Sequence, residues 1–309
     1  MINIVIHGAS SFLGKSFLKS LISSGTPVHV IARATSRIPF CEDCPTVRIY
    51  RYKRTITEID PQSLTIDNPV FFEFSWQGVY GSERNIPEQL SVNIPLIISS
   101  IQFSKDLRAR HWIGIGSQAE YGDLNKEISE SDDCHPTTLY GKSKLLCSEI
   151  SAEMCKAYTM EHSWLRLFSV YGPDDNHDWL IPWLIKEMLQ NMEINVTRGE
   201  QLWDYLFVDD ISEMLLKMVT AKGVGIANLG SGKPVEIRQL IEKIKKLTAS
   251  DSVINYGAVP YRPDQVMYML ANISRLASHL GWQPKTGIEE GLIKTIDFIK
   301  NERLGNTGK

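Results

Sequence analysis

The amino-acid sequence predicts an α/β protein built on a doubly wound parallel sheet, with a smaller lobe toward the C-terminus. Three features of the 309-residue chain support this fold class. Apolar strand-like segments alternate with amphipathic helix-like segments through the first 170 residues, as in a parallel sheet covered by helices on both faces. A glycine turn directly follows the first strand-like segment. Beyond residue 171 the alternation loosens, and tryptophan and proline are interspersed among shorter segments.

The individual elements follow from apolar periodicity and from the glycine and proline residues that bound it. Strands are expected at 2–7, 28–32, 46–50, 69–74, 111–115 and 163–168. Helices are expected from the glycine turn to about residue 24, over about 84–106, and from 140 to about 158. We assign residues 1–170 to the sheet domain and 171–309 to the smaller, substrate-binding lobe, with segments near 203–229 returning to the sheet domain.

Composition and charge exclude several classes of protein. The chain is 43% hydrophobic and 22% charged, as ordinary globular proteins are. Its net charge of −3 and its lack of a dense basic cluster argue against nucleic-acid binding. No apolar run approaches the roughly 20 residues of a membrane span, and the N-terminus lacks the basic start of a signal peptide. We expect a cytoplasmic protein, and five cysteines, an odd count, fit a reducing compartment.

The spacing of Cys41 and Cys44 raises the question of a metal or redox site. No second pair follows at the spacing of a zinc site, and His135 beside Cys134 is isolated. We therefore interpret the two cysteines as reduced thiols in a loop and expect no metal.

The turn from Gly8 to Gly14 predicts a site for the pyrophosphate of a dinucleotide. A glycine turn between a first strand and a first helix directs backbone N–H groups and the helix N-terminus at an anion. Ser11 stands at the middle glycine position, where a small residue still allows close approach, at some cost in backbone freedom. Residues 1–170 are thus expected to form a dinucleotide-binding Rossmann domain. The expected cofactor contacts in the turn are Gly8, Ser10, Ser11, Phe12, Leu13 and Gly14.

A P-loop is the alternative for the same stretch, because Gly14-Lys15-Ser16 resembles the end of that motif. A P-loop requires a glycine five residues before Gly14, and Ala9 occupies that position. The sequence therefore favours a dinucleotide over a nucleoside triphosphate.

The end of the second expected strand indicates which dinucleotide binds. An acidic residue there accepts the adenosine ribose hydroxyls, whereas an arginine accommodates a 2′-phosphate. The chain has Arg33 at this point, with Arg37 four residues on and no carboxylate before Glu42. We therefore expect NADP(H) in preference to NAD(H). The alternative is that Arg33 is a solvated loop charge.

Ser117, Tyr140 and Lys144 form the candidate catalytic set. Tyr140 and Lys144 are four residues apart and share one helix face. An ammonium beside a phenol lowers its pKa from an ordinary value near 10, toward the range in which tyrosine exchanges protons at neutral pH. Ser117 follows an expected strand and would hold a substrate oxygen against the tyrosine. The alternative is an ordinary surface pair, because this spacing also occurs by chance.

Taken together, these motifs resemble the extended short-chain dehydrogenases/reductases, and among them the nucleotide-sugar epimerases, dehydratases and reductases (the NAD-dependent epimerase/dehydratase family). The resemblance runs through nearly the whole chain. Its motifs are His7-Gly-Ala-Ser-Ser-Phe-Leu-Gly14, Gly116-Ser117-Gln-Ala-Glu-Tyr-Gly122, Tyr140-Gly-Lys-Ser-Lys144, Leu165-Arg-Leu-Phe-Ser-Val-Tyr-Gly-Pro173, Trp203-Asp-Tyr-Leu-Phe-Val-Asp-Asp210, Asn228-Leu-Gly-Ser-Gly232, Arg262-Pro-Asp264 and Gly281-Trp-Gln-Pro284.

The resemblance implies roles for the candidate residues. In this family the tyrosine, here Tyr140, exchanges a proton with a sugar hydroxyl or ketone, and the cofactor moves hydride. The lysine, here Lys144, also hydrogen-bonds the nicotinamide ribose, and Ser117 falls at the catalytic serine or threonine position. A nucleoside-diphosphate sugar is the implied substrate. A homodimer is implied as well, through helices at about 84–106 and 140–158.

The loop after the fourth expected strand is the expected wall of the ligand pocket, because doubly wound sheets bind ligands at the carboxyl ends of their strands. Ser75 and Trp76 are expected cofactor contacts, with core packing as the alternative for Trp76 and solvent exposure for Arg84. By resemblance, Arg262 lies on the substrate diphosphate, where a guanidinium suits phosphate oxygens; the alternative is an ion pair with Asp264. The expected substrate contacts are Trp76, Tyr80, Arg84, Ser117, Gln118, Trp203 and Arg262.

Four departures from the family pattern bear on function. Ser11 replaces a glycine, and Ser169 replaces a common asparagine. Trp203 replaces an arginine, so that nucleotide contact is lost or becomes a stacking contact. Gln118 and Ala119 stand where the sugar 4,6-dehydratases carry Asp-Glu. Without that acid and base the elimination has no evident catalyst, which argues against a dehydratase.

Three functions are compatible with these residues. The favoured one is NADPH-dependent reduction of a nucleoside-diphosphate 4-keto-(6-deoxy)sugar by Ser117, Tyr140 and Lys144. On the same scaffold, the alternative is a nucleotide-sugar 4-epimerase with tightly bound NAD, against which only Arg33 argues. From another class comes a catalytically silent NADP-sensing protein, although such descendants usually lose the Tyr or the Lys. No residue identifies the nucleotide or the sugar.

Overall fold

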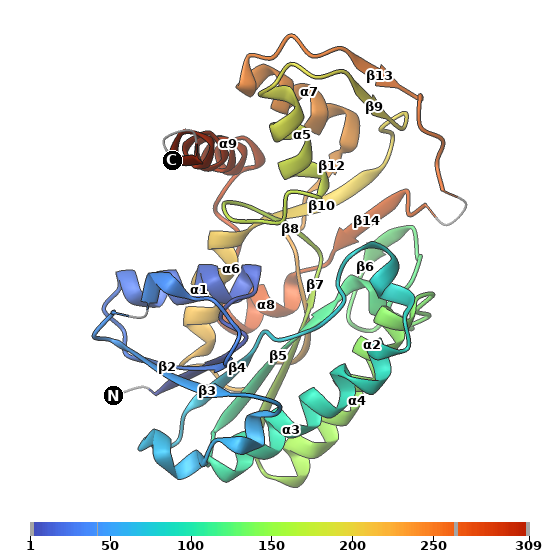
Figure 1. The fold of residues 1–309 in the computed structure, drawn as a ribbon. Coiled ribbons are helices and arrows are strands. Elements are labelled where there is room, and N and C mark those ends of the chain that lie inside the picture. The colour runs from blue at the N-terminus through green and yellow to red at the C-terminus, as the bar shows by residue number, and fades with distance from the viewer. Residues whose placement is uncertain (1–2, 42, 263–264, 307–309) are drawn as a thin grey trace.

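The computed structural model describes residues 3–41, 43–262 and 265–306, which form two lobes (Figure 1). In the described chain, seven parallel strands form the sheet of the larger lobe, in the spatial order β3-β2-β1-β4-β5-β7-β11. The strands are β1 (Ile4–His7), β2 (Val28–Arg33), β3 (Val47–Tyr52), β4 (Val70–Glu73), β5 (His111–Ser117), β7 (Glu161–Leu167) and β11 (Gly225–Leu229). The predicted doubly wound parallel sheet is confirmed.

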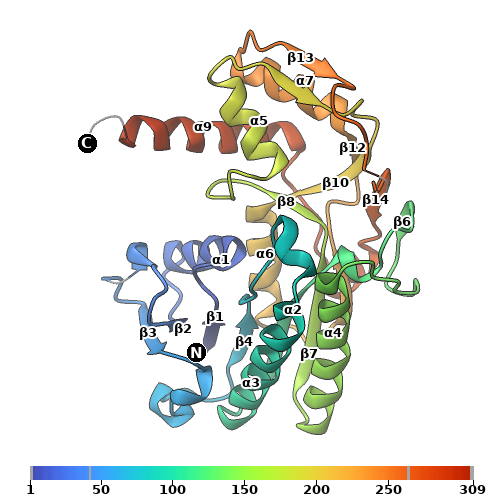
Figure 2. The ribbon, with the colours of Figure 1, turned by 45° about the vertical axis from the view of Figure 1, so that its right-hand side comes forward.

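Helices cover both faces of this sheet because both faces of its strands are apolar. Ile4 and Ile6 belong to one buried core, whereas Val5 between them belongs to a second core, as expected for side chains that alternate along a strand. The two helical layers lie on opposite sides of the sheet (Figures 1 and 2). The first layer is α1 (Phe12–Ser23), α6 (Val208–Met218) and α8 (Ser274–Leu280), and the second is α2 (Glu88–Ser91), α3 (Asn93–Asp106) and α4 (Leu139–Ala157).

The smaller lobe is organised around β10, which pairs with strands from distant parts of the chain. It pairs in parallel with β8 and β14 and antiparallel with β12, and β14 in turn pairs with β6. The strands are β6 (Lys126–Ile128), β8 (Ser169–Tyr171), β10 (Leu202–Phe207), β12 (Pro234–Glu236) and β14 (Tyr268–Ala271), with the separate pair β9 (Ile194–Val196) and β13 (Ile254–Tyr256). The helices are α5 (Leu180–Met188), α7 (Ile237–Thr248) and α9 (Ile288–Asn306), of which α9 extends away from the lobe (Figure 2).

The observed elements differ from the predicted ones mainly between the fourth and fifth strands. The helix predicted over about 84–106 consists of a 3₁₀ turn, η4 (Gly81–Asn85), followed by α2 and α3. Pro87 explains the break, because proline disfavours a helical backbone in the residue before it, and Ile86 is extended with φ −89° and ψ 151°. Within the segment 203–229, α6 and β11 lie on the large sheet, whereas β10 belongs to the sheet of the smaller lobe.

The strand order predicts a ligand crevice between β1 and β4. From β1 the sheet grows through β2 to β3 on one side and through β4 to β11 on the other. Open α/β sheets bind ligands outside the carboxyl ends of the strands at the point where the strand order reverses. His7 ends β1 and Glu73 ends β4, so the glycine turn and the loop after β4 both begin at this crevice.

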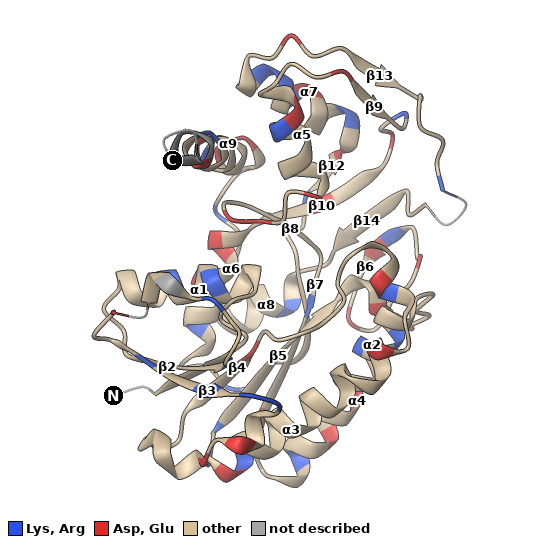
Figure 3. Ribbon diagram, viewed as in Figure 1, with Lys and Arg blue, Asp and Glu red and all other residues tan. Residues whose placement is uncertain are grey.

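The distribution of charge and the length of the helices bear on the expected partners. In the view of Figure 3, basic and acidic residues are interspersed over both lobes. None of the helices within the described ranges is long and apolar enough to cross a membrane.

Candidate active site

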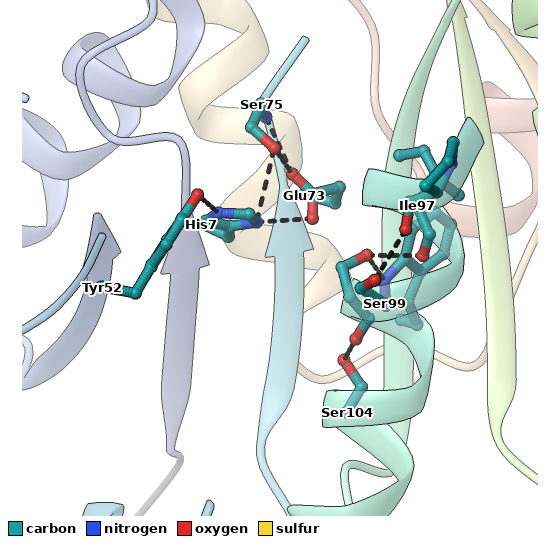
Figure 4. A network of polar contacts seen from close by, with 10 residues as sticks. His7, Tyr52, Glu73, Ser75, Ile97, Ser99 and Ser104 are labelled. Carbon is teal, nitrogen blue, oxygen red and sulfur yellow. Dashed lines mark hydrogen bonds and ion pairs between the residues drawn. The ribbon is translucent and has the colours of Figure 1, made fainter. Parts of the chain in front are cut away.

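A buried polar network joins β3, β1 and β4 at the carboxyl edge of the sheet (Figure 4). Nδ1 of His7 lies 2.8 Å from Oε2 of Glu73, and Nε2 of His7 lies 2.9 Å from the hydroxyl of Tyr52. The backbone N–H of Ser75 donates to Oε1 of Glu73 at 2.8 Å, and the Ser75 hydroxyl donates to the same oxygen. Burial, followed by Glu73, raises the pKa of Tyr52 to about 12, so its phenol stays protonated. The network holds the strand ends together beneath the crevice.

The glycine turn has the shape that a pyrophosphate site requires. Gly8 has φ +86°, a left-handed conformation that glycine adopts freely, and a Cβ on it would lie 2.5 Å from the backbone nitrogen of Ser75. A Cβ on Gly14 would collide with the carbonyl oxygen of Gly8. The position of Ser11 does not require glycine, because its φ is −72°. Its hydroxyl accepts from the Gly14 N–H at 3.2 Å and so caps α1. The other turn residues are half-buried around this cap: Ser10, Phe12 and Leu13.

Two exposed arginines lie at the carboxyl end of β2. Arg33 ends the strand and Arg37 follows in the loop. Arg33 is in register with Tyr52, the last residue of β3. Arg51 donates from Nη1 to the carbonyls of Arg33 and Ser36, at 3.3 and 2.9 Å, and so shapes the backbone of this loop. The two exposed guanidinium groups therefore stand one strand away from the glycine turn.

Ser117 is held by a capping box at the end of β5. It precedes the 3₁₀ turn η5 (Gln118–Glu120), and its hydroxyl accepts from the Ala119 N–H at 3.2 Å. In return, its backbone N–H donates to Oε1 of Glu120 at 2.8 Å, the reciprocal bonding of a capping box. Gln118 is the half-buried first residue of the turn.

Glu120 is fully buried and makes further contacts besides the capping bond to Ser117. Its Oε2 lies 2.7 Å from Nε of Arg166 on β7, and its Oε1 accepts from the indole N–H of Trp164 at 2.9 Å. Burial raises the pKa of Glu120, and the Arg166 guanidinium acts against that rise. The pair therefore ties the Ser117 loop to the neighbouring strand.

Tyr140 and Lys144 lie in the first turns of α4, at the same edge of the sheet. Thr138 caps this helix, with its hydroxyl accepting from the Gly141 N–H at 3.1 Å. Tyr140 is half-buried and Lys144 is buried. Nζ of Lys144 donates to the carbonyl of Ile115 at 2.6 Å and lies 3.6 Å from the centroid of the Trp76 ring. The helix thus delivers both side chains to the end of β5.

The electrostatics at Tyr140 differ from the sequence expectation of a lowered pKa. Burial raises the pKa of Tyr140, while the Ser117 hydroxyl and Arg84 lower it. Nζ of Lys144 is 5.9 Å from the centroid of the Tyr140 ring, whereas Cζ of Arg84 is 4.5 Å from it. Burial lowers the pKa of Lys144 to about 8. The ammonium of Lys144 instead contacts the carbonyl of Ile115 and the ring of Trp76.

The loop after β4 forms a wall beside Tyr140. The Trp76 ring meets the Tyr140 ring edge to face, with centroids 6.0 Å apart, and its indole N–H donates to Oε1 of Gln89 at 3.1 Å. Asn93 pins the same loop, accepting from the Gln77 N–H at 2.9 Å and donating to its carbonyl at 3.0 Å. Trp76 and Arg84 are both half-buried. Neither core burial nor full exposure describes them.

Two expected substrate contacts lie in the smaller lobe. The indole N–H of Trp203, on β10, donates to the carbonyl of Val266 at 2.9 Å, and its ring contacts Tyr205. Arg262 is exposed in the segment before β14. Asp264, its alternative partner, lies outside the described residues. The structure thus groups Ser117, Gln118, Tyr140, Lys144, Trp76 and Arg84, and sets Trp203 and Arg262 on the other lobe.

Sequence reasoning overlooked Glu120, Arg166 and Glu73. The spacing Ser-x-x-Glu from Ser117 to Glu120 is a capping-box signature that predicts the contact of these two residues. Arg166 and Glu73 carry no such local signal, because their partners are distant in sequence.

No metal centre accompanies the site in the part of the chain that the structure describes. Its His, Cys, Asp and Glu side chains form no group of three or more arranged to hold a metal ion. The Cys41 thiol donates to the carbonyl of Ile38 at 3.2 Å, and the Cys44 thiol lies 3.2 Å from the Thr46 hydroxyl.

Comparison with known proteins gives a consistent family. Residues 4–230 match the model of the NAD dependent epimerase/dehydratase family. CDP-abequose synthase of Salmonella muenchen is 30% identical over 304 residues, which are 96% of this chain and 97% of that protein. UDP-glucuronate 4-epimerase of Thermodesulfobacterium geofontis is 27% identical over 226 residues, 72% of this chain and 69% of that protein. The structure of UDP-glucose 4-epimerase from Thermotoga maritima has a TM-score of 0.83 at 21% identity, covering 98% of this chain and 100% of the other.

The chain therefore belongs to the NAD dependent epimerase/dehydratase family. It is an NAD(P)-dependent enzyme of the extended short-chain dehydrogenase/reductase type, and the resemblance drawn from its motifs is confirmed. The turn between Gly8 and Gly14 fits the dinucleotide that the family name implies, because only residues without a Cβ allow the close backbone packing that leads it into the N-terminus of α1.

Replacing Glu120 by alanine is expected to lower the free energy of unfolding by about 3–5 kcal/mol, because it leaves the buried Arg166 charge unpaired. Urea denaturation followed by circular dichroism measures the change. Glu153→Ala, which removes an exposed carboxylate of α4, is the matched control and should leave the midpoint unchanged. Equal midpoints for the two variants would contradict the role assigned to the pair.

Proposed function

We propose that the enzyme reduces the keto group of a nucleoside-diphosphate 4-keto-(6-deoxy)sugar with NADPH. The observation that carries the proposal is the convergence of Ser117, Tyr140 and Lys144 at the end of β5, at the same edge of the sheet as the glycine turn. Gln118 stands where elimination of water would need an acid. Similarity to CDP-abequose synthase along nearly the full length of both chains supports a nucleoside-diphosphate sugar, and makes cytidine the first nucleotide to test.

The residues that would hold the cofactor are those around the crevice. The turn from Gly8 to Gly14 and the N-terminus of α1 suit the pyrophosphate. Arg33 and Arg37 are exposed and suit a 2′-phosphate. Lys144 is the residue for the nicotinamide ribose. The bound nicotinamide supplies the hydride, which no protein side chain can provide.

Tyr140 is the proton donor in this proposal. Because burial raises its pKa, the phenol is protonated at neutral pH, which is the form that reduction of a ketone needs. The Ser117 hydroxyl, held by its capping box, would keep the ketone oxygen within reach of the phenol. Tyr140 gives its proton to that oxygen as hydride reaches the carbon, and it regains a proton from solvent.

The two lobes would bind different parts of the substrate. Trp76 and Arg84 form a wall beside Tyr140 and would face the sugar, and Tyr80 of the same segment, which packs on Trp179, would contact the substrate farther out. Trp203 and Arg262, on the smaller lobe, suit the nucleoside diphosphate, for which a guanidinium is a natural partner. The substrate would therefore lie across both lobes, with its reacting carbon at the sheet.

A nucleotide-sugar 4-epimerase with tightly bound NAD is the second candidate, favoured by the similarity to UDP-glucuronate 4-epimerase. Denaturing the purified protein and identifying any released dinucleotide separates the two. Stoichiometric NAD, together with interconversion of a UDP-hexose without added cofactor, would establish the epimerase. A preference for added NADPH over NADH supports the reductase. Turnover of either kind would remove the third alternative, a catalytically silent NADP-sensing protein.

We also propose a cytoplasmic homodimer in which α3 and α4 form the interface. These helices lie side by side on one face of the sheet (Figure 2), and Leu146 of α4 is 42% exposed there. Light scattering is expected to give twice the chain mass of 35.0 kDa, and Leu146→Glu to shift the protein toward the monomer. A monomeric mass for the unaltered protein would refute the interface.

Tyr140→Phe is expected to lower kcat for NADPH oxidation with a keto-sugar nucleotide by about 10²–10⁴-fold, because it removes the proton donor. NADPH binding, followed by its fluorescence, should persist. The control is Tyr158→Phe, which removes a phenol at the opposite end of α4 and should retain full activity. An unchanged kcat in Tyr140→Phe would rule out this mechanism.

Arg33→Ala is expected to weaken NADPH binding roughly 10-fold and to leave NADH binding unchanged, because only NADPH carries the 2′-phosphate. Fluorescence titration of both cofactors measures the two dissociation constants. Arg48→Ala removes another exposed arginine, on the neighbouring strand β3, and should alter neither constant. An equal loss for both cofactors in Arg33→Ala would contradict the assignment.

A further inference from the structure

Arg84 is the cation closest to the catalytic tyrosine. Its Cζ lies 4.5 Å from the centroid of the Tyr140 ring, within the range of a cation–π contact. Its Nε is buried and has no hydrogen-bond partner among the described residues. None of the ion pairs in the described ranges involves Arg84, so no carboxylate neutralises its charge. A half-buried, unneutralised guanidinium on the ring of the proton donor calls for an explanation beyond substrate binding.

Arg84 belongs to the 3₁₀ turn η4, which is anchored by contacts with both lobes. At its end, Oδ1 of Asn85 accepts from the backbone N–H of Leu139, the first residue of the helix that carries Tyr140, at 3.1 Å. At its start, the Tyr80 ring packs on Trp179 of the smaller lobe, with centroids 5.5 Å apart. Tyr80 and Trp179 are 39% and 41% exposed, so the contact bridges the lobes at the surface.

The other groups around Tyr140 leave Arg84 as its cationic partner. On α4, Lys144 is directed at the carbonyl of Ile115 and at the Trp76 ring. From β5 and η5 come the neutral Ser117 hydroxyl and the Glu120 carboxylate, and the latter is paired with Arg166. The loop after β4 contributes the neutral indole of Trp76. Among the described residues the Arg84 guanidinium is the cation nearest to the phenol ring, with Nζ of Lys144 farther away at 5.9 Å from the ring centroid.

We propose that Arg84 is a second cation of the catalytic centre, which stabilises the negative charge that Tyr140 carries after it has given up its proton. In that step the O–H bond of Tyr140 breaks, a new O–H bond forms on the sugar oxygen, and hydride from the cofactor reaches the carbon. The charge of a phenolate spreads into its ring, so a cation on the ring face is attracted more strongly after the transfer than before. The direction of proton transfer rests on the proposed function, but the effect of Arg84 on Tyr140 does not.

The test compares Arg84→Met, which removes the charge, with Arg84→Lys, which keeps it. The control is Lys142→Met, which removes an exposed cation of α4, the helix that carries Tyr140. In each full-length protein the ring-carbon NMR signal of isotope-labelled tyrosine is followed against pH, with Tyr140→Phe identifying the signal. Tyr140 is expected to titrate at a higher pH in Arg84→Met than in the unaltered protein. It should titrate between the two in Arg84→Lys, and be unchanged in Lys142→Met. Circular dichroism checks that each variant is folded. If Arg84→Met does not fold, the titration of Arg84→Lys is used for the test instead.

The same variants are then assayed for reduction of a keto-sugar nucleotide by NADPH across the pH range. Arg84→Met is expected to lower kcat roughly 10-fold at neutral pH. Its activity should persist to a higher pH, because reduction needs the protonated phenol and that proton is lost later. Unchanged titration of Tyr140 in Arg84→Met would overturn the inference even if the enzyme is a reductase. A shifted titration without reductase activity would uphold the inference and refute the proposed function instead.

Discussion

The buried ion pair between Glu120 and Arg166 is the interaction on which the arrangement of the site depends. It holds the backbone of Ser117 on one side and the indole of Trp164 on the other. The Arg166 guanidinium also lies 4.4 Å from the ring of Tyr121, whose hydroxyl donates to Asn228 of β11 at 2.6 Å. Asn228 in turn donates to the carbonyl of Ile128 in the sheet of the smaller lobe. A buried pair is a weak source of net stability, but with its hydrogen bonds complete it specifies one arrangement of its neighbours. The turn that holds Ser117 is thereby connected to both lobes.

The chemistry at the sheet edge follows from burial as much as from charge. The same desolvation that raises the pKa of Tyr140 lowers the pKa of Lys144 to about 8. At neutral pH the phenol is therefore protonated, and the lysine is still mostly charged. A protonated phenol is an acid, and this agrees with the direction of a reductase. Reduction and epimerisation would both use the proposed set of Ser117, Tyr140 and Lys144. What distinguishes them has to be sought in the surroundings of those residues, and here these are Arg84, Gln118 and the pair Arg33 and Arg37.

Sequence reasoning was most successful where the signal is local. Six of the seven strands of the large sheet were predicted within a few residues, because both faces of a parallel sheet demand apolar residues. The seventh, β11, was not predicted as a strand. The Tyr-x-x-x-Lys spacing placed both side chains at one edge because helix geometry requires it. The helix over about 84–106 was wrong in its start and its continuity, although Pro87 carried the signal for the break, and α2 and α3 occupy most of the predicted range. Nζ of Lys144 lies 5.9 Å from the centroid of the Tyr140 ring, but its other partners, Ile115 and Trp76, were not predicted because they come from strands and loops distant in the chain.

By itself, the sequence determined the α/β class, the glycine turn, the Ser117, Tyr140 and Lys144 set, and the family. Each of these follows from spacings of a few residues that match helix, strand or turn geometry. Only the tertiary structure decided that Ser11 caps α1 without needing a glycine conformation, that His7 and Glu73 join β1 to β4, and that Arg84 lies on the phenol. These contacts join residues that are distant in sequence, or they depend on how a loop packs. A sequence pattern does not specify how far apart such residues lie in space.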